Sequence, residues 1–192
     1  MAIAFRFPAE LWNIFAAKSM SADVRIRPIV MDDVPTLYES VRESIDALRP
    51  WMPWCHDGYS ISESREWVEK QIASFAEKQE FHFSILSADQ FAGICGLNGI
   101  RDANRLANLG YWIRTSMCNR GIATGATRLL VDWAFQNTEL DRIEIVAAVG
   151  NIPSLRVAAK AGAVWEGVMR GRLRISDTLH DAVLFSIIRG DR

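Results

Sequence analysis

The 192-residue sequence has little cysteine, almost no net charge and no long apolar run. Its three cysteines, Cys55, Cys95 and Cys118, are odd in number and widely spaced, which excludes a zinc site or a disulfide framework. A reducing compartment, the cytoplasm, fits this cysteine usage best. No apolar stretch reaches the roughly 20 residues that cross a membrane. The formal net charge of -1 gives no bulk attraction to nucleic acid or to an anionic membrane.

Several familiar catalytic patterns are also missing. The sequence has no phosphate loop of the form GxxxxGK[ST], no GxGxxG fingerprint and no nucleophile elbow ordered with an aspartate and a histidine. His56, His82 and His180 lie in an aromatic loop, at a strand start and in a turn, so they favour no particular chemistry. We expect neither a metal ion nor a covalent enzyme intermediate.

The length and the balance of 49% hydrophobic and 23% charged residues predict one globular domain over residues 23–192. Residues 1–22 form an N-terminal extension of uncertain role. Polar residues and a proline interrupt its apolar pattern, so it makes a poor signal peptide. A partner-binding helix and a misassigned start remain alternatives for residues 1–19, because Met20 opens a stretch that resembles a natural start.

Hydrophobic periodicity predicts a mixed α/β fold in the order β-α-α-β-β-β-α-β-α-β-β. The predicted strands are Val24–Ile29, Phe81–Ser87, Phe91–Leu97, Leu109–Arg114, Arg142–Val149, Val164–Met169 and Ala182–Ile188. Ser60 and Glu63 form a capping box at the start of a helix whose inward positions are expected to include Trp67, Ile72 and Phe75. The next helix is expected to bury Ile122, Ala126, Leu129 and Trp133.

The segment Asn119–Gly125 lies between a predicted strand and an amphipathic helix. A helix start leaves several N–H groups unpaired and carries partial positive charge. Gly121 would let a bulky anion approach the backbone, and the small residues after it leave the first turn open. The segment therefore predicts a diphosphate cradle at the main-chain amides of Arg120, Gly121, Ile122, Ala123 and Thr124, with a simple tight turn as the alternative.

Two further motifs follow the strongest strand. In Asn151-Ile-Pro-Ser154, Asn151 can cap a helix, and the hydroxyl of Ser154 could protonate a departing thiolate. In Gly162-Ala-Val-Trp-Glu-Gly167, Glu166 has apolar or small neighbours, which predicts a partly desolvated carboxylate with a raised pKa that could act as a general base. An exposed strand carboxylate is the alternative for Glu166.

Two clusters remain open at this stage. Arg170, Arg172 and Arg174 would share one face of a strand, either as a solvated edge or as a site for an anionic partner. Trp51, Trp54 and Tyr59 belong to an aromatic, proline-rich segment that either packs as core or lid, or forms an aromatic wall for a substrate.

Taken in order, these segments resemble the GNAT superfamily of N-acetyltransferases. The resemblance spans about residues 24–189 and is greatest to the branch of ribosomal-protein N-terminal acetyltransferases of the Rim type. The matching segments are LRPWMPW (48–54), GYWIRTSMCNRGIATGATRLLVDWAF (110–135), RIEIVAAVGNIPSLRVAAKAGAVWEGVMR (142–170) and HDAVLFSII (180–188). The resemblance implies a central, mostly antiparallel sheet with a splayed parallel strand pair.

The resemblance also implies roles in the binding of acetyl-CoA or CoA. The pyrophosphate would bind the amides of Arg120–Thr124, and the pantetheine arm would run beside Tyr111–Arg114, with Trp112, Ile113 and Arg114 counted as binding residues. Asn151 would contact the pantetheine, and Ser154 would lie near the thioester sulfur. The acetyl carbonyl would face a main-chain N–H near Ile113.

One departure from the superfamily pattern concerns the start of the cradle. Cys118 stands where the pattern has Gln or Arg, which predicts weaker CoA binding. The implied reaction is direct transfer in a ternary complex. The acceptor could be a protein N-terminal α-amine, for which the resemblance suggests a ribosomal protein, or a small amine such as a polyamine, an amino-acid derivative or an aminoglycoside. The third alternative for the function is a CoA-binding regulatory module with little catalysis. The resemblance also suggests a homodimer, because homodimers are common in this branch.

Overall fold

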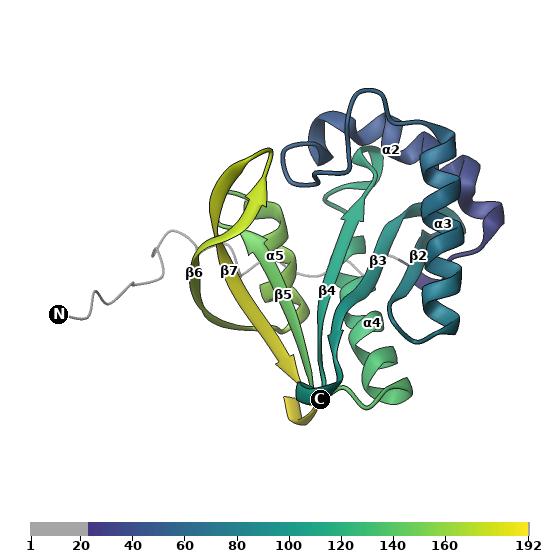
Figure 1. Ribbon diagram of the computed structural model, residues 1–192. Helices are drawn as coiled ribbons and strands as arrows, with labels where there is room; N and C mark the ends of the chain where they lie inside the picture. Colours follow the sequence, from purple (N-terminus) through teal and green to yellow (C-terminus); the bar gives the residue numbers. More distant parts are fainter. Residues whose placement is uncertain (1–22, 192) are drawn as a thin grey trace.

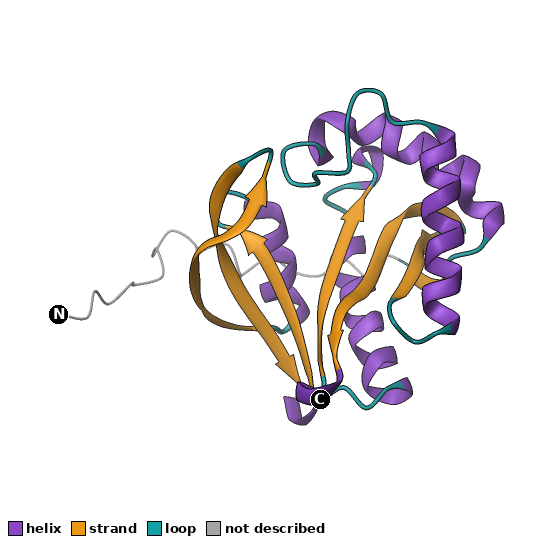
Figure 2. Ribbon diagram, in the orientation of Figure 1, coloured by secondary structure: helices purple, strands orange, loops and turns teal. Residues whose placement is uncertain are grey.

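The computed structural model describes residues 23–191, and its centre is one seven-stranded sheet (Figures 1 and 2). The strand order is β1-β2-β3-β4-β5-β7-β6. The strands are β1 (Val24–Pro28), β2 (Phe81–Ser87), β3 (Gln90–Arg101), β4 (Leu106–Ile113), β5 (Arg142–Ala148), β6 (Val164–Ile175) and β7 (Thr178–Ile188). The predicted order of strands and helices is confirmed. Residues 1–22, where the N-terminal extension was predicted, lie outside the described residues.

The parallel pair β4–β5 divides the sheet. All other neighbours are antiparallel, whereas β4 and β5 pair only from Leu106 with Arg142 to Asn108 with Glu144. Beyond Asn108 the two strands diverge, and Figure 1 shows them close together at the lower end and apart at the upper end. The remainder of β4 therefore has an edge without a neighbouring strand.

Helices cover both faces of the sheet. The helices α2 (Val34–Leu48) and α3 (Ile61–Ala76) lie over β2 and β3, and α4 (Ile122–Asn137) and α5 (Ile152–Ala161) lie on the other face (Figure 1). The predicted capping box is present: Ser60 Oγ accepts from the N–H of Glu63, and Glu63 Oε2 accepts from the N–H of Ser60. Gly162 ends α5 at a φ of 98°, the left-handed conformation that glycine tolerates best.

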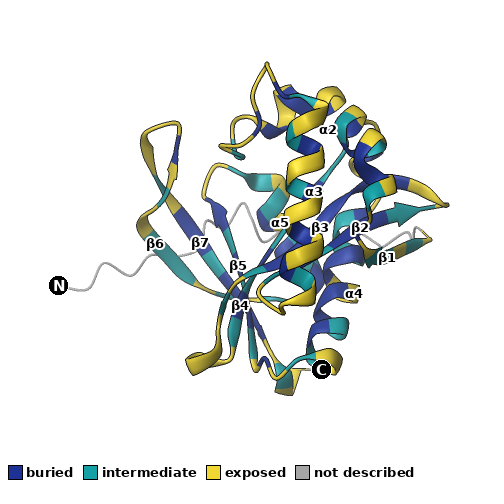
Figure 3. Ribbon diagram, turned by 45° about the vertical axis from the view of Figure 1, so that its right-hand side comes forward, coloured by how far each residue is buried: buried dark blue, intermediate teal, exposed yellow. Residues whose placement is uncertain are grey.

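Two apolar clusters form the core, one on each face of the sheet. Figure 3 shows the contrast between the buried strands and the exposed outer surface of α3. Two predicted inward residues are wrong: Ile72 and Leu129 are each 38% exposed. In α3 the inward position next to Ile72 belongs to Gln71, which is 3% exposed and polar. A search for apolar periodicity cannot identify such a residue as inward.

The β6–β7 hairpin is longer than predicted, and β6 is an edge strand of the sheet. Its turn contains Ser176 and Asp177, both at positive φ. Arg170, Arg172 and Arg174 are exposed on this edge strand, as the first of their two interpretations predicts.

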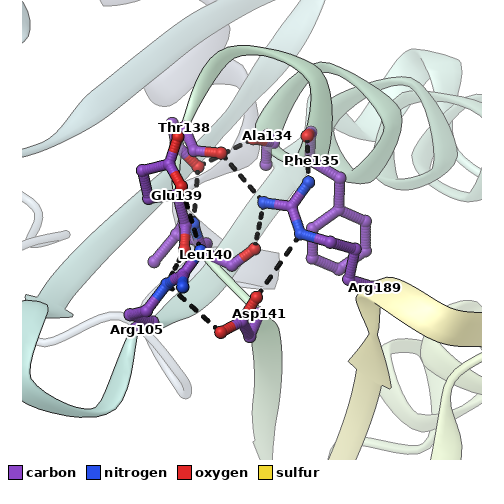
Figure 4. Close-up of polar contacts among 8 residues, drawn as sticks. All are labelled: Arg105, Ala134, Phe135, Thr138, Glu139, Leu140, Asp141 and Arg189. Carbon is purple, nitrogen blue, oxygen red and sulfur yellow. Dashed lines mark hydrogen bonds and ion pairs between the residues drawn. The ribbon is translucent and has the colours of Figure 1, made fainter.

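Arg189 joins the end of β7 to the end of α4 (Figure 4). Its guanidinium donates to the carbonyl oxygens of Phe135, Thr138 and Leu140, and it forms an ion pair with Asp141. The last carbonyls of a helix have no intrahelical donor, so a cation placed there stabilises the helix end. This contact fixes α4 from the end opposite to the predicted cradle.

None of the helices described over residues 23–191 is both long and apolar enough to span a lipid bilayer. Over the same residues, no group of three or more histidine, cysteine or acidic side chains is placed to hold a metal ion. The three cysteines are free thiols, with Cys118 exposed and the other two buried.

Candidate active site

The loop after β4 is held in place by α2. The Glu43 carboxylate accepts from the guanidinium of Arg114 and from the N–H of Ser116 at 2.7 Å, and Ser44 Oγ accepts from the N–H of Thr115 at 2.9 Å. The hydrogen bond and charge of Arg114 hold the pKa of Glu43 at about 2, well below its usual range. This anchor fixes the direction in which the chain enters α4.

The predicted cradle has the geometry of an anion site. The main-chain N–H groups from Asn119 to Thr124 have no acceptor within residues 23–191, and the first helical bond is that from Gly125 to Gly121 O at 3.0 Å. Asn119 and Gly121 have φ values of 62° and 77°. Alternating left-handed and right-handed residues turn successive N–H groups toward one concave surface, a known anion-binding arrangement. The residues present thus fit a diphosphate.

The free edge of β4 leads away from this cradle. The N–H of Arg114 donates to Ala92 O at 2.8 Å, on the β3 side. Because successive strand residues direct their N–H and C=O groups to opposite edges, those of Ile113 and Tyr111 point to the side from which β5 has diverged. Of the three predicted binding residues on this strand, Ile113 has its main chain at the free edge. The ring of Trp112 is buried, and the guanidinium of Arg114 is engaged by Glu43.

Asn151 caps α5, since its Oδ1 accepts from the N–H of Ser154 at 3.3 Å. Tyr111, across the divergence, contacts Ser154 twice: its hydroxyl donates to the Ser154 carbonyl oxygen at 2.9 Å and lies 3.1 Å from Ser154 Oγ. Burial raises the pKa of Tyr111 to about 12, so the phenol stays protonated at neutral pH. The two hydroxyl groups form a hydrogen-bonded pair between β4 and α5.

The predicted raised pKa of Glu166 is wrong. Its carboxylate accepts two hydrogen bonds from Arg142 and one from Ser186 Oγ at 2.6 Å, which lowers its pKa to about 2. Arg142 also donates to Glu144, which is paired with Asn108 at the point where β4 and β5 begin to diverge. A carboxylate with so low a pKa is a weak general base, so we assign it no proton transfer. Glu166 instead holds Arg142 at the base of the divergence.

A cavity of about 510 Å³ lies on the other side of β4, between α2, α3 and strands β2–β4. Its walls include Tyr111 and Trp112, so it adjoins the strand whose free edge faces α5. Its aromatic lining residues are Trp54, Tyr59, Trp67, Tyr111 and Trp112. Its polar lining residues are Glu63, Lys70, Gln71, Glu80, His82 and Asn98. A largely apolar hollow with a few polar groups is typical of a ligand site.

The aromatic segment after α2 supplies part of this wall. Trp54 is 43% exposed, and its ring lies 6.0 Å from that of Tyr59 and 6.3 Å from that of Trp112. Trp51 lies against Gly150, where an added Cβ would be 3.3 Å from the indole. The segment therefore reaches across the divergence to the β5–α5 loop, and its residues Trp54 and Tyr59 line the cavity.

A comparison with protein families decides what this arrangement is. The family described as "Acetyltransferase (GNAT) domain" matches residues 23–164. The chain belongs to the GNAT acetyltransferase family.

Curated relatives of this GNAT chain include "Putative ribosomal N-acetyltransferase YdaF" of Bacillus subtilis. It is 29% identical over 167 residues, which cover 86% of this chain and 91% of the relative. The ribosomal-protein-serine acetyltransferase of Escherichia coli is 25% identical over 169 residues, which cover 88% of this chain and 94% of the relative. The chain is thus similar to N-acetyltransferases over nearly their whole length.

The solved structures include RimL, described as a ribosomal L7/L12 alpha-N-protein acetyltransferase in complex with coenzyme A. It superposes with a TM-score of 0.81 at 24% identity and covers 90% of this chain and 97% of RimL. At this identity the likeness establishes the fold, and it confirms the predicted splayed parallel pair in a mostly antiparallel sheet. This GNAT chain is an acetyl-CoA-dependent N-acetyltransferase.

Sequence reasoning missed three features of the GNAT site. Glu43 lies 71 residues before Arg114, and no local motif marks the pair. Tyr111 was noted only as a neighbour of the pantetheine path, although its pairing with Ser154 is a central contact. His82 was given no role, yet it is 12% exposed at the side chain and lines the cavity.

Proposed function

We propose that the chain transfers the acetyl group of acetyl-CoA to the N-terminal α-amine of a protein, by direct attack in a ternary complex. One observation carries the proposal. The divergence of β4 from β5 gives one strand a free edge leading from the cradle toward Tyr111, and that strand also forms a wall of the cavity. Donor and acceptor can therefore approach from opposite sides of β4.

In this proposal the acetyl-CoA pyrophosphate binds the unpaired amides of Arg120, Gly121, Ile122, Ala123 and Thr124. The pantetheine arm pairs with the free edge of β4 as an added strand would. Asn151 keeps its capping bond through Oδ1, which leaves its Nδ2 to donate to a pantetheine carbonyl. Cys118, at the start of the cradle, supplies no cation, which makes the amides the main source of binding.

The chemistry follows from these positions. The neutral amine attacks the thioester carbon, a C–N bond forms, and the carbonyl electrons move to the oxygen, which the N–H of Ile113 stabilises. Collapse of the intermediate breaks the C–S bond, and Ser154, whose hydroxyl Tyr111 orients, donates its proton to the departing thiolate and regains a proton from solvent. The nitrogen loses its extra proton to solvent. Removal of one oxyanion donor costs roughly 3–4 kcal/mol of transition-state stabilisation in known cases.

An α-amine suits this site better than a lysine side chain. Its reference pKa is about 7.7–8.0 against about 10.4 for lysine, so a useful fraction is already neutral at pH 7. No strong general base is then required. The names of the relatives, which refer to ribosomal proteins, support the same substrate class. A small cationic amine is the second candidate, favoured by the carboxylates of Glu63 and Glu80 in the cavity.

The test is release of free CoA thiol from acetyl-CoA in the presence of N-terminal peptides, ε-amino lysine peptides and small amines. Mass spectrometry then locates the acetyl group. Acetylation of the peptide α-amine supports the proposal, whereas turnover only with small amines selects the second candidate. Absence of turnover with every amine would indicate a CoA-binding module.

Ser154→Ala tests the assigned proton donor. We expect turnover to fall while the affinity for acetyl-CoA stays close to that of the wild type, because the hydroxyl acts on the departing sulfur. Unchanged turnover would remove Ser154 from the mechanism and leave the remainder of the proposal standing.

A further inference from the structure

Four side chains form a hydrogen-bonded chain in the wall of the cavity. With the Gln71 amide turned to match its neighbours, the indole Nε1–H of Trp67 donates to the amide oxygen at 3.3 Å. The Gln71 amide nitrogen lies 3.1 Å from Glu80 Oε2 and 2.8 Å from His82 Nδ1. Gln71 is 3% exposed, so its amide depends on these partners.

The chemistry of the outer members fixes the proton on the histidine. An indole N–H can only donate and an ionised carboxylate can only accept, so the Gln71 oxygen must face Trp67 and its NH₂ must face Glu80. The same NH₂ meets His82 Nδ1, which must therefore accept. In a neutral imidazole the other nitrogen then carries the proton, so His82 has an Nε2–H group.

The surroundings of His82 keep this ring neutral and in place. Burial and the charge of Lys70 lower the pKa of His82 to about 4. Trp67 packs against the ring edge at 5.4 Å, and an added Cβ at Gly96 would lie 2.3 Å from His82 Cδ2. Gly96 thus leaves the space that the ring fills. Within residues 23–191, the contact of His82 to a charged group is made by Nδ1 and no hydrogen bond is made by Nε2, and His82 lines the cavity.

We propose that His82 is a specificity residue whose Nε2–H donates to a carbonyl oxygen adjacent to the acceptor amine, so that the cavity selects α-amino acyl compounds over simple amines. This inference rests on the proposed function and deepens it. A fixed N–H cannot accept from an ammonium or amine group, but it pairs with the carbonyl of the first residue of a peptide. Glu63 and Glu80 in the same cavity suit the amine itself.

The same hydrogen bonds leave His82 unable to act as a general base. The nitrogen directed to Gln71 is already an acceptor in use, and Nε2 has no free lone pair. His82 therefore affects acceptor binding more than the rate of the chemical step. The other titratable groups that line the cavity are those of Glu63, Glu80, Lys70, Tyr59 and Tyr111.

The test uses the full chain with two acceptors: seryl-alanyl-alanine amide, and its analogue in which an E-alkene replaces the first peptide bond. The analogue keeps the amine and the extended shape but lacks the carbonyl oxygen. The variants are His82→Phe, which keeps an aromatic ring on Gly96 and against Trp67, and His82→Gln, whose amide can restore a donor. KM and kcat for each acceptor, KM for acetyl-CoA and the circular dichroism spectrum are measured.

With the peptide, we expect His82→Phe to raise KM about tenfold, with little change in kcat or in KM for acetyl-CoA. His82→Gln should recover part of the loss, and with the alkene analogue the wild type and His82→Phe should have the same KM. The proposal would be overturned if His82→Phe raised KM equally for both acceptors, or if it removed the acidic limb of the pH–rate profile. A wild type that acetylates none of the N-terminal peptides refutes the proposed function itself, which is a separate result.

Discussion

Gly121 offers the sharpest test of the cradle, because it lies among six N–H groups without an acceptor in the described chain and has a φ of 77°. Replacement of Gly121 with Glu places a negative charge where the diphosphate is proposed to bind. Gly121→Ala is the matched control, since it imposes the same backbone strain without the charge. The difference between the two variants isolates the electrostatic contribution.

The expected magnitudes follow from two sources. A side chain in the left-handed conformation costs roughly 1–2 kcal/mol, and both variants carry this cost in the stability of the fold. Two like charges about 4 Å apart repel by about 1 kcal/mol in water and about 4 kcal/mol at an effective dielectric constant of 20. Since 1.4 kcal/mol is a factor of ten, we expect Gly121→Glu to bind CoA between about fivefold and several hundredfold more weakly than Gly121→Ala.

Titration calorimetry with CoA measures this difference directly. Turnover with S-acetylpantetheine provides the internal control, because this donor has the thioester and the pantetheine arm but no phosphate. We expect the two variants to use it equally well. Raised ionic strength should reduce the difference in CoA affinity, as screening predicts.

Two outcomes would refute the reasoning. Equal CoA affinity of the two variants would show that the diphosphate does not lie on these amides. A loss with S-acetylpantetheine as large as that with acetyl-CoA would show that Gly121→Glu distorts the site rather than repels the phosphates.

Three further changes test other contacts. Tyr111→Phe removes the contacts of 2.9 and 3.1 Å from the Tyr111 hydroxyl to Ser154. In a thiol-release assay we therefore expect kcat to fall about tenfold with little change in KM for acetyl-CoA. An unchanged kcat would show that Tyr111 does not position Ser154. The pKa of Glu43 is about 2 in the folded state against a reference of 4.5, so the stabilisation by its carboxylate is complete above pH 4.5 and is lost as the pH falls toward 2. In urea unfolding, we therefore expect Glu43→Gln to be less stable than the wild type at pH 7. The difference in the free energy of unfolding should narrow as the pH drops below 4.5. Arg189→Met should lower the free energy of unfolding by about 1–3 kcal/mol, because it leaves three carbonyl oxygens without their donor. Arg189→Lys should have a stability between those of the wild type and Arg189→Met. Equal stability of the wild type and both variants would contradict the contacts in Figure 4.

The fold could be predicted where local chemistry decides it. The capping box of Ser60 and Glu63, the Asn151 cap and the Gly162 helix end each depend on residues within a few positions of one another. Strand alternation is equally local, which is why the order of elements was correct. The ends of β6 and β7 were missed because a polar, arginine-rich segment extends an exposed edge hairpin.

The errors and omissions in the site all involve partners distant in sequence. Glu166 has apolar neighbours along the chain, which predicts desolvation, but Arg142 lies 24 residues away and reverses the direction of the pKa shift. The role of His82 depends on a helix that places Gln71 beside it and on a glycine in the next strand that leaves room for its ring. Sequence spacing gives no measure of such contacts, because the tertiary fold alone brings them together.

The alternation of β4 explains how one strand can serve two substrates. Trp112 directs its ring into the apolar cluster beside α2 and its main chain toward β3, whereas Tyr111, one residue earlier, directs its hydroxyl to α5 and its main chain to the free edge. Insertion or deletion of a single residue in this strand would exchange these directions. The divergence from β5 is therefore useful only with this register, which places the Tyr111–Ser154 pair beside the free edge and the aromatic wall on the opposite face.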